Sequence, residues 1–305
     1  AAAYRAYLKD DYLPRARAIS ASLKRDFPSG DANLIFSSGA WLAFRASVSG
    51  GMQAYASGAY TQTLQILESD AAALGVEAAE ALALAAAGDA QPVVRNQWQS
   101  LNPSVLLPLI SPSASPVFQA VLARFGADAA SSISAAATTA FIRQGFAGLD
   151  SVLKGWPSVP LSWSATGSRT AQAWAYRRAS HATYRANREL LRGWVWVAAL
   201  DRRVCVSCLA MHGTRHSVDE TLNDHHNGRC TPVPIVVGSD LTDSVGSARG
   251  WFDRQTRKVQ LEIMGPGKLK AYQEGRFEWD KMSRVYTDKI YGVMRRGATL
   301  EELLR

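Results

Sequence analysis

The chain contains three cysteines, and all of them lie in one short segment, at Cys205, Cys208 and Cys230. Three thiols cannot all pair within one chain, and without a secretory signal such clustering favours metal binding over disulfides. Two cysteines separated by two residues can hold one metal ion from a tight turn, and a second pair further along completes a tetrahedron. The segment is therefore expected to fold around a metal ion.

A histidine can supply the fourth ligand of the tetrahedron. Four of the five in the chain lie between Cys205 and Cys230, and the full set stands at positions 181, 212, 216, 225 and 226. The spacing allows the second ligand pair to be His225 with Cys230 or His226 with Cys230. Thiolate and imidazole ligands suit zinc, so we predict a zinc knuckle over about residues 200–236.

The metal is expected to be structural. Four protein ligands would close the site, whereas a catalytic zinc keeps an open position for water. The sequence carries no H-E-x-x-H helix, no Walker loop, no G-x-G-x-x-G and no G-x-S-x-G. We therefore expect no enzyme. The alternative is a zinc-dependent nuclease or another nucleic-acid-modifying enzyme, in which His212, His216 or His226 acts as the base.

The N-terminal half has the pattern of helices. Apolar residues recur at three- and four-residue steps from Ala1 to Phe27, a stop follows at 28–31, and alanine becomes frequent from Ala71 onward. Further helices are expected over 31–48, ending at Gly50-Gly51, and over 52–87 and 93–148. No long alternation of apolar and polar residues indicates a sheet in this half.

The C-terminal half is expected to be α+β. Proline, glycine and serine concentrate at 155–168, which predicts a linker between an Ala-rich helical domain (1–154) and a second domain (169–305). Beyond the linker we expect an Arg-bearing helix and two short strands around the knuckle, at 169–192, 194–200 and 233–237. Helices are expected at 250–264, 267–275 and 280–294, and a short capped helix with Thr299 as N-cap and Glu302 at the capping-box position. The fold class is thus mainly α, with a small β-hairpin zinc knuckle.

Charge points to acidic partners. The net charge is +8, which favours nucleic acid or an acidic protein surface. Arginines along 169–192 and basic residues of the C-terminal helices can lie against phosphates, or can simply form a solvated face. No run of 18 apolar residues occurs, and the first residues lack the apolar core of a signal peptide, so we expect a soluble protein made in a cytoplasm, with no membrane partner.

The region around the cysteines resembles a known family. Trp196, Asp201, Arg203, Cys205, Cys208 and Gly213, followed by His225, Gly228-Arg229-Cys230 and Pro234, are similar to the motif of the Mu F-like minor head proteins of tailed bacteriophages. The resemblance continues through Trp251-Phe252 to Gly275 and covers about residues 166–296. Many relatives have a cysteine where this chain has Gly228. Aligned on Cys230, the family histidine falls at His225.

The resemblance implies a role as well as a ligand set. It favours Cys205, Cys208, His225 and Cys230 as the zinc ligands, with His226 as the alternative to His225. It also implies a minor structural component of the virion head near the portal vertex, acting in head assembly or genome delivery. The implied partners are the portal or major capsid protein and packaged double-stranded DNA. The Ala-rich N-terminal helices could bundle with one another or with other copies of the chain, which adds the chain itself as a possible partner.

Overall fold

The structure is a computed structural model that describes residues 2–239 and 245–305. In this part of the chain the fold is mainly helical, as the sequence predicts, and it includes two small antiparallel sheets. Among the described residues, no helix combines the length and the apolar character needed to cross a membrane.

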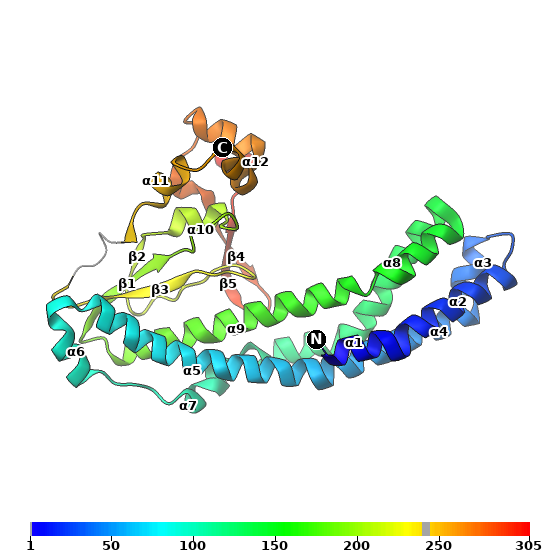
Figure 1. Ribbon diagram of the computed structural model, residues 1–305, viewed down its shortest axis with the longest axis horizontal. Coiled ribbons are helices and arrows are strands. Elements are labelled where there is room, and N and C mark those ends of the chain that lie inside the picture. Colours follow the sequence, from blue (N-terminus) through cyan, green and yellow to red (C-terminus); the bar gives the residue numbers. More distant parts are fainter. Residues whose placement is uncertain (1, 240–244) are drawn as a thin grey trace. The chain divides into compact units, whose positions relative to one another are not determined.

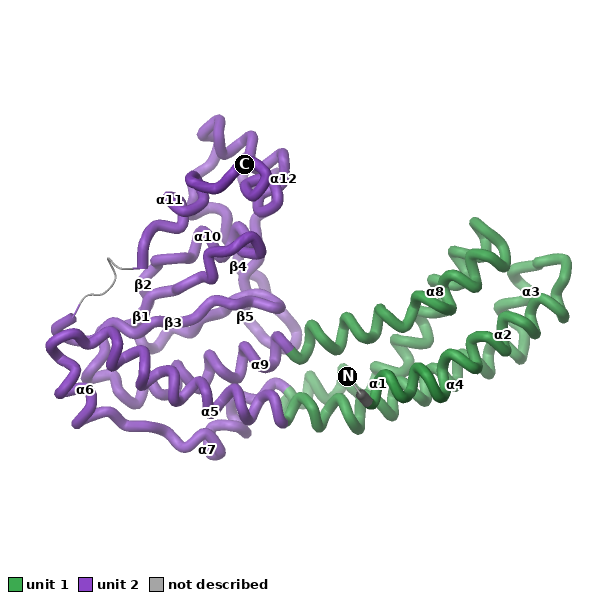
Figure 2. The backbone as a smooth tube through the Cα atoms, viewed as in Figure 1, with its two compact units in different colours: residues 1–65, 113–168 green, residues 66–112, 169–305 purple. Residues whose placement is uncertain are grey.

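The chain forms two compact units (Figure 2). The first unit contains residues 1–65 and 113–168, and the second contains residues 66–112 and 169–305. The division falls inside two long helices, α5 (Thr61–Ala86) and α9 (Ser158–Ala186). Each unit therefore joins two separate stretches of sequence, unlike the contiguous domains expected at 1–154 and 169–305.

The described part of the first unit is helical (Figure 1). Besides the ends of α5 and α9, its elements are α1 (Ala2–Tyr7), the π-helical turn η1 (Leu8–Tyr12), α2 (Leu13–Asp26), α3 (Ala32–Ser37), α4 (Gly39–Tyr55), the π-helical turn η2 (Ala56–Tyr60) and α8 (Pro116–Gly155). The predicted stop at 28–31 is confirmed. Asp31 caps α3, because its side chain accepts hydrogen bonds from the backbone N–H groups of Asn33 and Leu34, at 2.8 and 3.2 Å.

Buried aromatic side chains form the core of the first unit. Tyr12 and Trp41 are almost fully buried, and α2 and α4 pack against α8. The Tyr12 hydroxyl donates a hydrogen bond of 2.8 Å to the carbonyl oxygen of Leu153, and the Tyr60 hydroxyl donates one of 3.2 Å to that of Ser164. Each buried hydroxyl thus has an acceptor, which removes the cost of burying it unpaired.

Helix α8 reverses direction at Gly145, which has the left-handed φ of +56°. The returning segment lies against the first one, because the Trp156 indole donates a hydrogen bond of 3.2 Å to Ser132 Oγ. A Cβ on Gly148 would meet the carbonyl oxygen of Ala140 at 2.2 Å. The two glycines therefore permit the turn and the close packing that follows it.

Two predicted breaks are helical in the structure. Helix α4 runs through Gly50-Gly51, and the Tyr7 ring fills the space where a side chain of Gly51 would stand. The predicted linker 155–168 is mostly the first part of α9, which begins at Ser158. Pro160 lies in the first turn of that helix. A backbone N–H at this position would have no intrahelical acceptor, so its absence in proline does not interrupt the helix.

The second unit surrounds a three-stranded sheet. After α5 come the 3-10 turn η3 (Gly88–Ala90), α6 (Gln91–Gln97), α7 (Pro103–Ile110) and, at the unit boundary, the turn η4 (Pro112–Ala114). After α9 come β1 (Leu191–Val197), α10 (Val206–Met211), β2 (Arg215–His216), β3 (Thr231–Val236), α11 (Ala248–Asp253), α12 (Arg257–Gln273), η6 (Trp279–Met282), β4 (Ser283–Asp288), β5 (Gly292–Gly297) and α13 (Leu300–Leu304). The strands predicted at 194–200 and 233–237 are confirmed as β1 and β3.

In this sheet β1 is the central strand, and both β2 and β3 pair with it in antiparallel register. Trp194 and Trp196 of β1 are buried. Their partners across the strand pair are Pro234 and Pro232 of β3, which lies at the edge of the sheet, where a residue without N–H is tolerated. Helices α5 and α9 lie side by side below the sheet in this view (Figure 1), since a Cβ on Gly75 would meet the carbonyl oxygen of Tyr176 at 2.3 Å.

The C-terminal predictions are correct only in part. The helix predicted at 280–294 is wrong: these residues form most of the β4–β5 hairpin, with Gly292 at φ +71°. The Asp288 side chain accepts hydrogen bonds from the backbone N–H groups of Ile290 and Tyr291, which makes the turn. The capping box is confirmed, because Thr299 and Glu302 each accept a hydrogen bond from the backbone of the other.

Candidate metal centre

The first pair of predicted ligands stands at the start of α10. Cys205 is the N-cap of this helix, and its sulfur accepts a hydrogen bond of 3.3 Å from the backbone N–H of Cys208. The helical turn brings the two sulfurs to 3.3 Å from each other. The pair therefore presents both thiols on the same side of the turn, as the two-residue spacing predicts.

His225 joins this pair from the loop between β2 and β3. Its Nε2 lies 3.1 Å from the sulfur of Cys205 and 3.1 Å from that of Cys208. Its Nδ1 donates a hydrogen bond of 2.8 Å to the carbonyl oxygen of His226. A metal-bound histidine typically donates its second ring N–H to a carbonyl in this way, which fixes the ring and directs the other nitrogen to the metal.

Cys230 completes the cluster from the residue before β3. The possible ligand atoms form two groups, and within each group all the atoms lie within 4.8 Å of one another. One group contains Cys205, Cys208 and His225, and the other contains Cys208, Asp224 and Cys230. Cys208 belongs to both groups. The fold thus brings together all four predicted residues from three separate segments, although on a helical turn and loops rather than on a β-hairpin.

The spacing of these atoms fits a small divalent cation. Zinc–sulfur bonds of about 2.3 Å in a tetrahedron separate two sulfurs by about 3.8 Å. The sulfurs of Cys205 and Cys208 are 3.3 Å apart, which is about half an ångström less, and each lies 3.1 Å from His225 Nε2. An outward movement of a few tenths of an ångström by each ligand would make room for the ion.

Asp224 and Arg177 support the cluster from behind. Both side chains are at most 5% exposed, and Arg177 Nη2 lies 3.1 Å from Asp224 Oδ2. The Asp224 carboxylate also accepts hydrogen bonds from the backbone N–H groups of His225, at 2.8 Å, and Cys230, at 3.3 Å. A Cβ at Gly228 would lie 2.0 Å from the same carboxylate, so this position requires glycine. Sequence reasoning missed this ion pair, because nothing local connects an arginine of α9 with an aspartate 47 positions later.

In the metal-free cluster the pKa of one thiol is lowered, whereas those of a second thiol and of the histidine are raised. The hydrogen bond from Cys208, with a contribution from His225 and against the effect of burial, lowers the pKa of the Cys205 thiol to about 5. The same hydrogen bond and a second one with Cys230 raise the pKa of the Cys208 thiol. Burial disfavours a charged His225, but the Cys205 sulfur and the Asp224 carboxylate outweigh it and raise the pKa of His225 to about 9. A metal ion must therefore displace protons from His225 and Cys208.

The other histidines lie outside the cluster. His226 Nε2 is 3.2 Å from Asp288 Oδ2, so of the two candidates that the spacing left open, the fold places His225 against the thiols. The His212 ring accepts a hydrogen bond of 3.0 Å from the backbone N–H of Ala198, and the buried His181 accepts one of 2.9 Å from that of Leu222. His216 stacks on Trp194 with ring centroids 4.3 Å apart.

The acidic residues near the cysteines in sequence are also engaged elsewhere. Asp219 forms an ion pair of 2.7 Å with Arg188, and Glu220 accepts a hydrogen bond of 2.7 Å from the backbone N–H of Ser217. Within the part of the chain that the structure describes, Asp224 is the acidic residue that reaches the cluster, and it is paired with Arg177.

Helix α9 holds the loop that carries His225. Its side chains form hydrogen bonds along this segment, through the pairs Arg169–Asn227, Thr170–Asn227, Arg177–Asp224, His181–Leu222, Tyr184–Pro232 and Arg185–Asp219. Several arginines that the sequence marked as possible phosphate contacts are thus bound to the protein's own loop. The helix acts as a support for the metal-binding segment.

Comparisons with known proteins add no relative. No protein-family model, no curated protein and no solved structure matches the chain.

Proposed function

We propose that Cys205, Cys208, His225 and Cys230 hold one zinc ion in a closed structural site. The observation that supports this most is the convergence of three thiols and one imidazole whose second ring N–H is bound to a carbonyl oxygen. The donor set is the one that zinc prefers. With four protein ligands the ion has no open position for a substrate or water.

The zinc would stabilise a part of the second unit that has little regular structure of its own. Its ligands come from the start of α10, from the loop between β2 and β3 and from the residue just before β3. One ion would cross-link these segments and replace the apolar contacts that short loops cannot make. Asp224 and Arg177 would fix the loop to α9 while the thiols bind the ion.

We further propose that the chain is a minor structural protein of the head of a tailed phage. The support is the resemblance of residues 166–296 to the Mu F-like minor head proteins, whose motif includes the four predicted ligands of the cluster. In this proposal the protein acts near the portal vertex, binds the portal or major capsid protein, and lies close to packaged DNA. The net charge of +8 suits such surroundings.

The zinc proposal is tested by elemental analysis of the purified, reduced full chain. We expect about one zinc per chain in the wild type and in His226→Ala, and none in Cys205→Ser or His225→Ala. His226→Ala is the matched control, because it removes a neighbouring imidazole and leaves its carbonyl oxygen in place. No metal in the wild type, or equal loss in His226→Ala, would overturn the assignment.

The head proposal is tested separately, with an antibody to the chain and purified particles of the phage that encodes it. We expect the protein in intact virions and in tailless heads, at few copies compared with the major capsid protein. Its absence from both kinds of particle would reject the head role and leave the zinc assignment untouched.

A further inference from the structure

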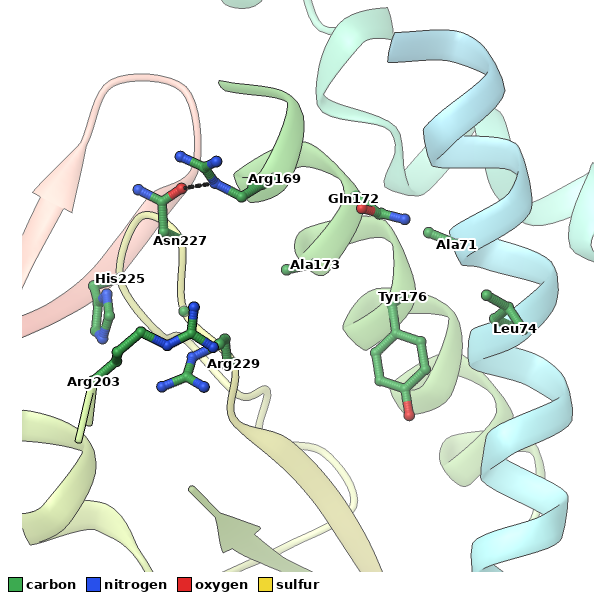
Figure 3. Close-up of a pocket in the computed structure, with 11 residues that line it drawn as sticks. Ala71, Leu74, Arg169, Gln172, Ala173, Tyr176, Arg203, His225, Asn227 and Arg229 are labelled. Carbon is green, nitrogen blue, oxygen red and sulfur yellow. Dashed lines mark hydrogen bonds between the residues drawn. The ribbon is translucent and has the colours of Figure 1, made fainter. Parts of the chain in front are cut away.

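A pocket of about 730 Å³ lies in the second unit beside the metal centre (Figure 3). It opens between α9, the adjoining part of α5 and the loop that carries His225. Its volume is within the range of about 300–1,000 Å³ that is typical of small-molecule sites. The proposed zinc site does not account for this space.

The two sides of the pocket differ in chemistry. One side is apolar and aromatic, formed by Ala71 and Leu74 of α5 with Ala173 and Tyr176 of α9. Leu74 is 54% exposed, so a large apolar side chain faces the opening.

The opposite side is basic. Arg169, Arg203 and Arg229 line it, together with His225 and Asn227 (Figure 3). Among the described residues, no aspartate or glutamate lines the pocket. The pocket is thus suited to a ligand with an anionic group at one end and an apolar or aromatic group at the other.

The positive charge of this side is only partly neutralised. Asp201 accepts hydrogen bonds from both terminal nitrogens of Arg229, at 2.5 and 2.7 Å, and lies 3.9 Å from Arg203. Arg169 donates from Nε to the side chain of Asn227, and within the described residues it forms no ion pair. The three guanidinium groups therefore outnumber the one carboxylate. A surplus remains even when a divalent cation held by three thiolates adds one negative charge.

We propose that this pocket binds a phosphate ester of a small aromatic or apolar group, with a nucleoside monophosphate as the probe. A carboxylate is fully bound by the two terminal nitrogens of one guanidinium group, as Asp201 is by Arg229, so a ligand that engages two further arginines needs more acceptor oxygens than a carboxylate has. A phosphate monoester carries about −1.5 to −2 at neutral pH and offers three acceptor oxygens, so it can accept from Arg169 and Arg203 together. The base or apolar group would lie against Leu74 and Tyr176. This inference rests on the pocket alone and does not depend on the proposed head role.

The test is titration calorimetry of the full chain with adenosine monophosphate, and the matched pair of variants is Arg203→Gln and Arg202→Gln. Both remove one exposed arginine charge, but Arg202 pairs with Glu262, at 2.7 Å, and does not line the pocket. Losing a charge-assisted hydrogen bond should weaken binding by about tenfold or more in Arg203→Gln, and not in Arg202→Gln. Equal losses in the two variants would mean diffuse surface attraction and would overturn the proposal, as would no saturable binding by the wild type.

A second pair of variants tests the apolar side. Leu74→Glu places a negative charge at the opening of the pocket, whereas Val93→Glu places one at another exposed position, since Val93 is 49% exposed. We expect Leu74→Glu alone to abolish binding, with the zinc content unchanged in both. Binding that survives Leu74→Glu would overturn the placement of the ligand.

The source of the phosphate is distinguished with single-stranded oligonucleotides. If the pocket takes the end of a nucleic-acid strand, a 5′-phosphorylated oligonucleotide should compete with adenosine monophosphate and its 5′-hydroxyl counterpart should not. If the ligand is a free nucleotide, neither oligonucleotide should compete. Equal competition by both would indicate binding through the strand backbone and would contradict a site for phosphate monoesters.

Discussion

The two compact units are stabilised in different ways. The first unit depends on helix packing, with aromatic and aliphatic side chains such as Trp41 and Leu23 buried between helices. The second unit contains a region in which polar groups set the structure: the Cys/His cluster, the Arg177–Asp224 ion pair and the hydrogen bonds from α9. Apolar packing tolerates substitutions of similar volume. A buried polar network loses much more when one member is removed, because the remaining members are left unsatisfied.

The largest effect is expected from Cys208→Ser, because Cys208 belongs to both groups of ligand atoms. The variant should lose its zinc. Zinc at about 1,000 times its dissociation constant stabilises the bound segment by about 4 kcal/mol, so amide exchange across 205–230 should rise about a thousandfold. Mass-detected hydrogen exchange measures this, with the amides of α8 as the internal reference. Equal acceleration in α8 would show that the two regions are not independent.

Arg177→Met should cost about 3–4 kcal/mol of unfolding free energy, because it leaves the Asp224 carboxylate buried without its cation. Denaturant unfolding gives the value. The matched control is Arg188→Met, which breaks an exposed pair with Asp219 and should cost less than about 1 kcal/mol. Similar losses of unfolding free energy in the two variants would mean that the buried Arg177–Asp224 pair contributes no more than the exposed Arg188–Asp219 pair.

In the first unit, Leu23→Ala should cost about 2–3 kcal/mol, because Leu23 is fully buried and its removal leaves a cavity. Leu42→Ala removes the same atoms at a position that is 48% exposed, and its cost should stay within about 0.5 kcal/mol. Zinc content should remain at the wild-type level in both. Loss of zinc from Leu23→Ala would contradict the separation of the two kinds of stabilisation.

The pH dependence should differ between metal binding and the metal-free fold. Zinc must displace protons from His225, whose pKa is raised to about 9, and from Cys208, so its affinity should rise between about pH 6 and pH 8 by about tenfold per unit for each proton released. Competition with a chelating dye at several pH values measures this. A flat profile would mean that these groups do not bind the ion.

In the metal-free protein, the contribution of His225 to folding stability falls as the pH rises, whereas the zinc affinity rises with pH. A raised folded-state pKa stabilises the fold below the ordinary value of 6.5, and this contribution is lost as the pH rises through about 9. The lowered pKa of Cys205 gives a contribution that is lost as the pH falls through about 5. The two contributions therefore overlap between about pH 5 and pH 9. His225→Ala should remove the loss of stability on the alkaline side from the unfolding curves, whereas the loss on the acid side should remain, because the hydrogen bond from Cys208 is its main cause.

The smallest effect is expected at the C-terminus. Thr299→Ala removes the N-cap of α13 and should cost about 1 kcal/mol, whereas Thr299→Ser keeps the hydroxyl and should cost little. Thermal unfolding compares the two. An equal loss in both variants would show that the methyl group, rather than the hydrogen bond to Glu302, makes the contribution.

The sequence by itself determined the features that depend on neighbouring residues. Helical periodicity and the stop at 28–31 predicted the first helices, the β-branched and aromatic run predicted β1, and the Thr299–Glu302 spacing predicted the capping box. The two-residue spacing of Cys205 and Cys208 placed two thiols together for the same reason. Each of these depends on torsion angles and hydrogen bonds within a few residues.

Only the tertiary structure decided the rest. Pro160 and Gly167 predicted a linker, but the proline falls in the first turn of α9, and a Cβ on Gly167 would lie 2.3 Å from the Tyr60 hydroxyl. Residues 283–297 became a hairpin, and His225 rather than His226 came to face the thiols. These outcomes depend on contacts between residues far apart in the chain, and local propensities of about 1 kcal/mol or less are too small to oppose them.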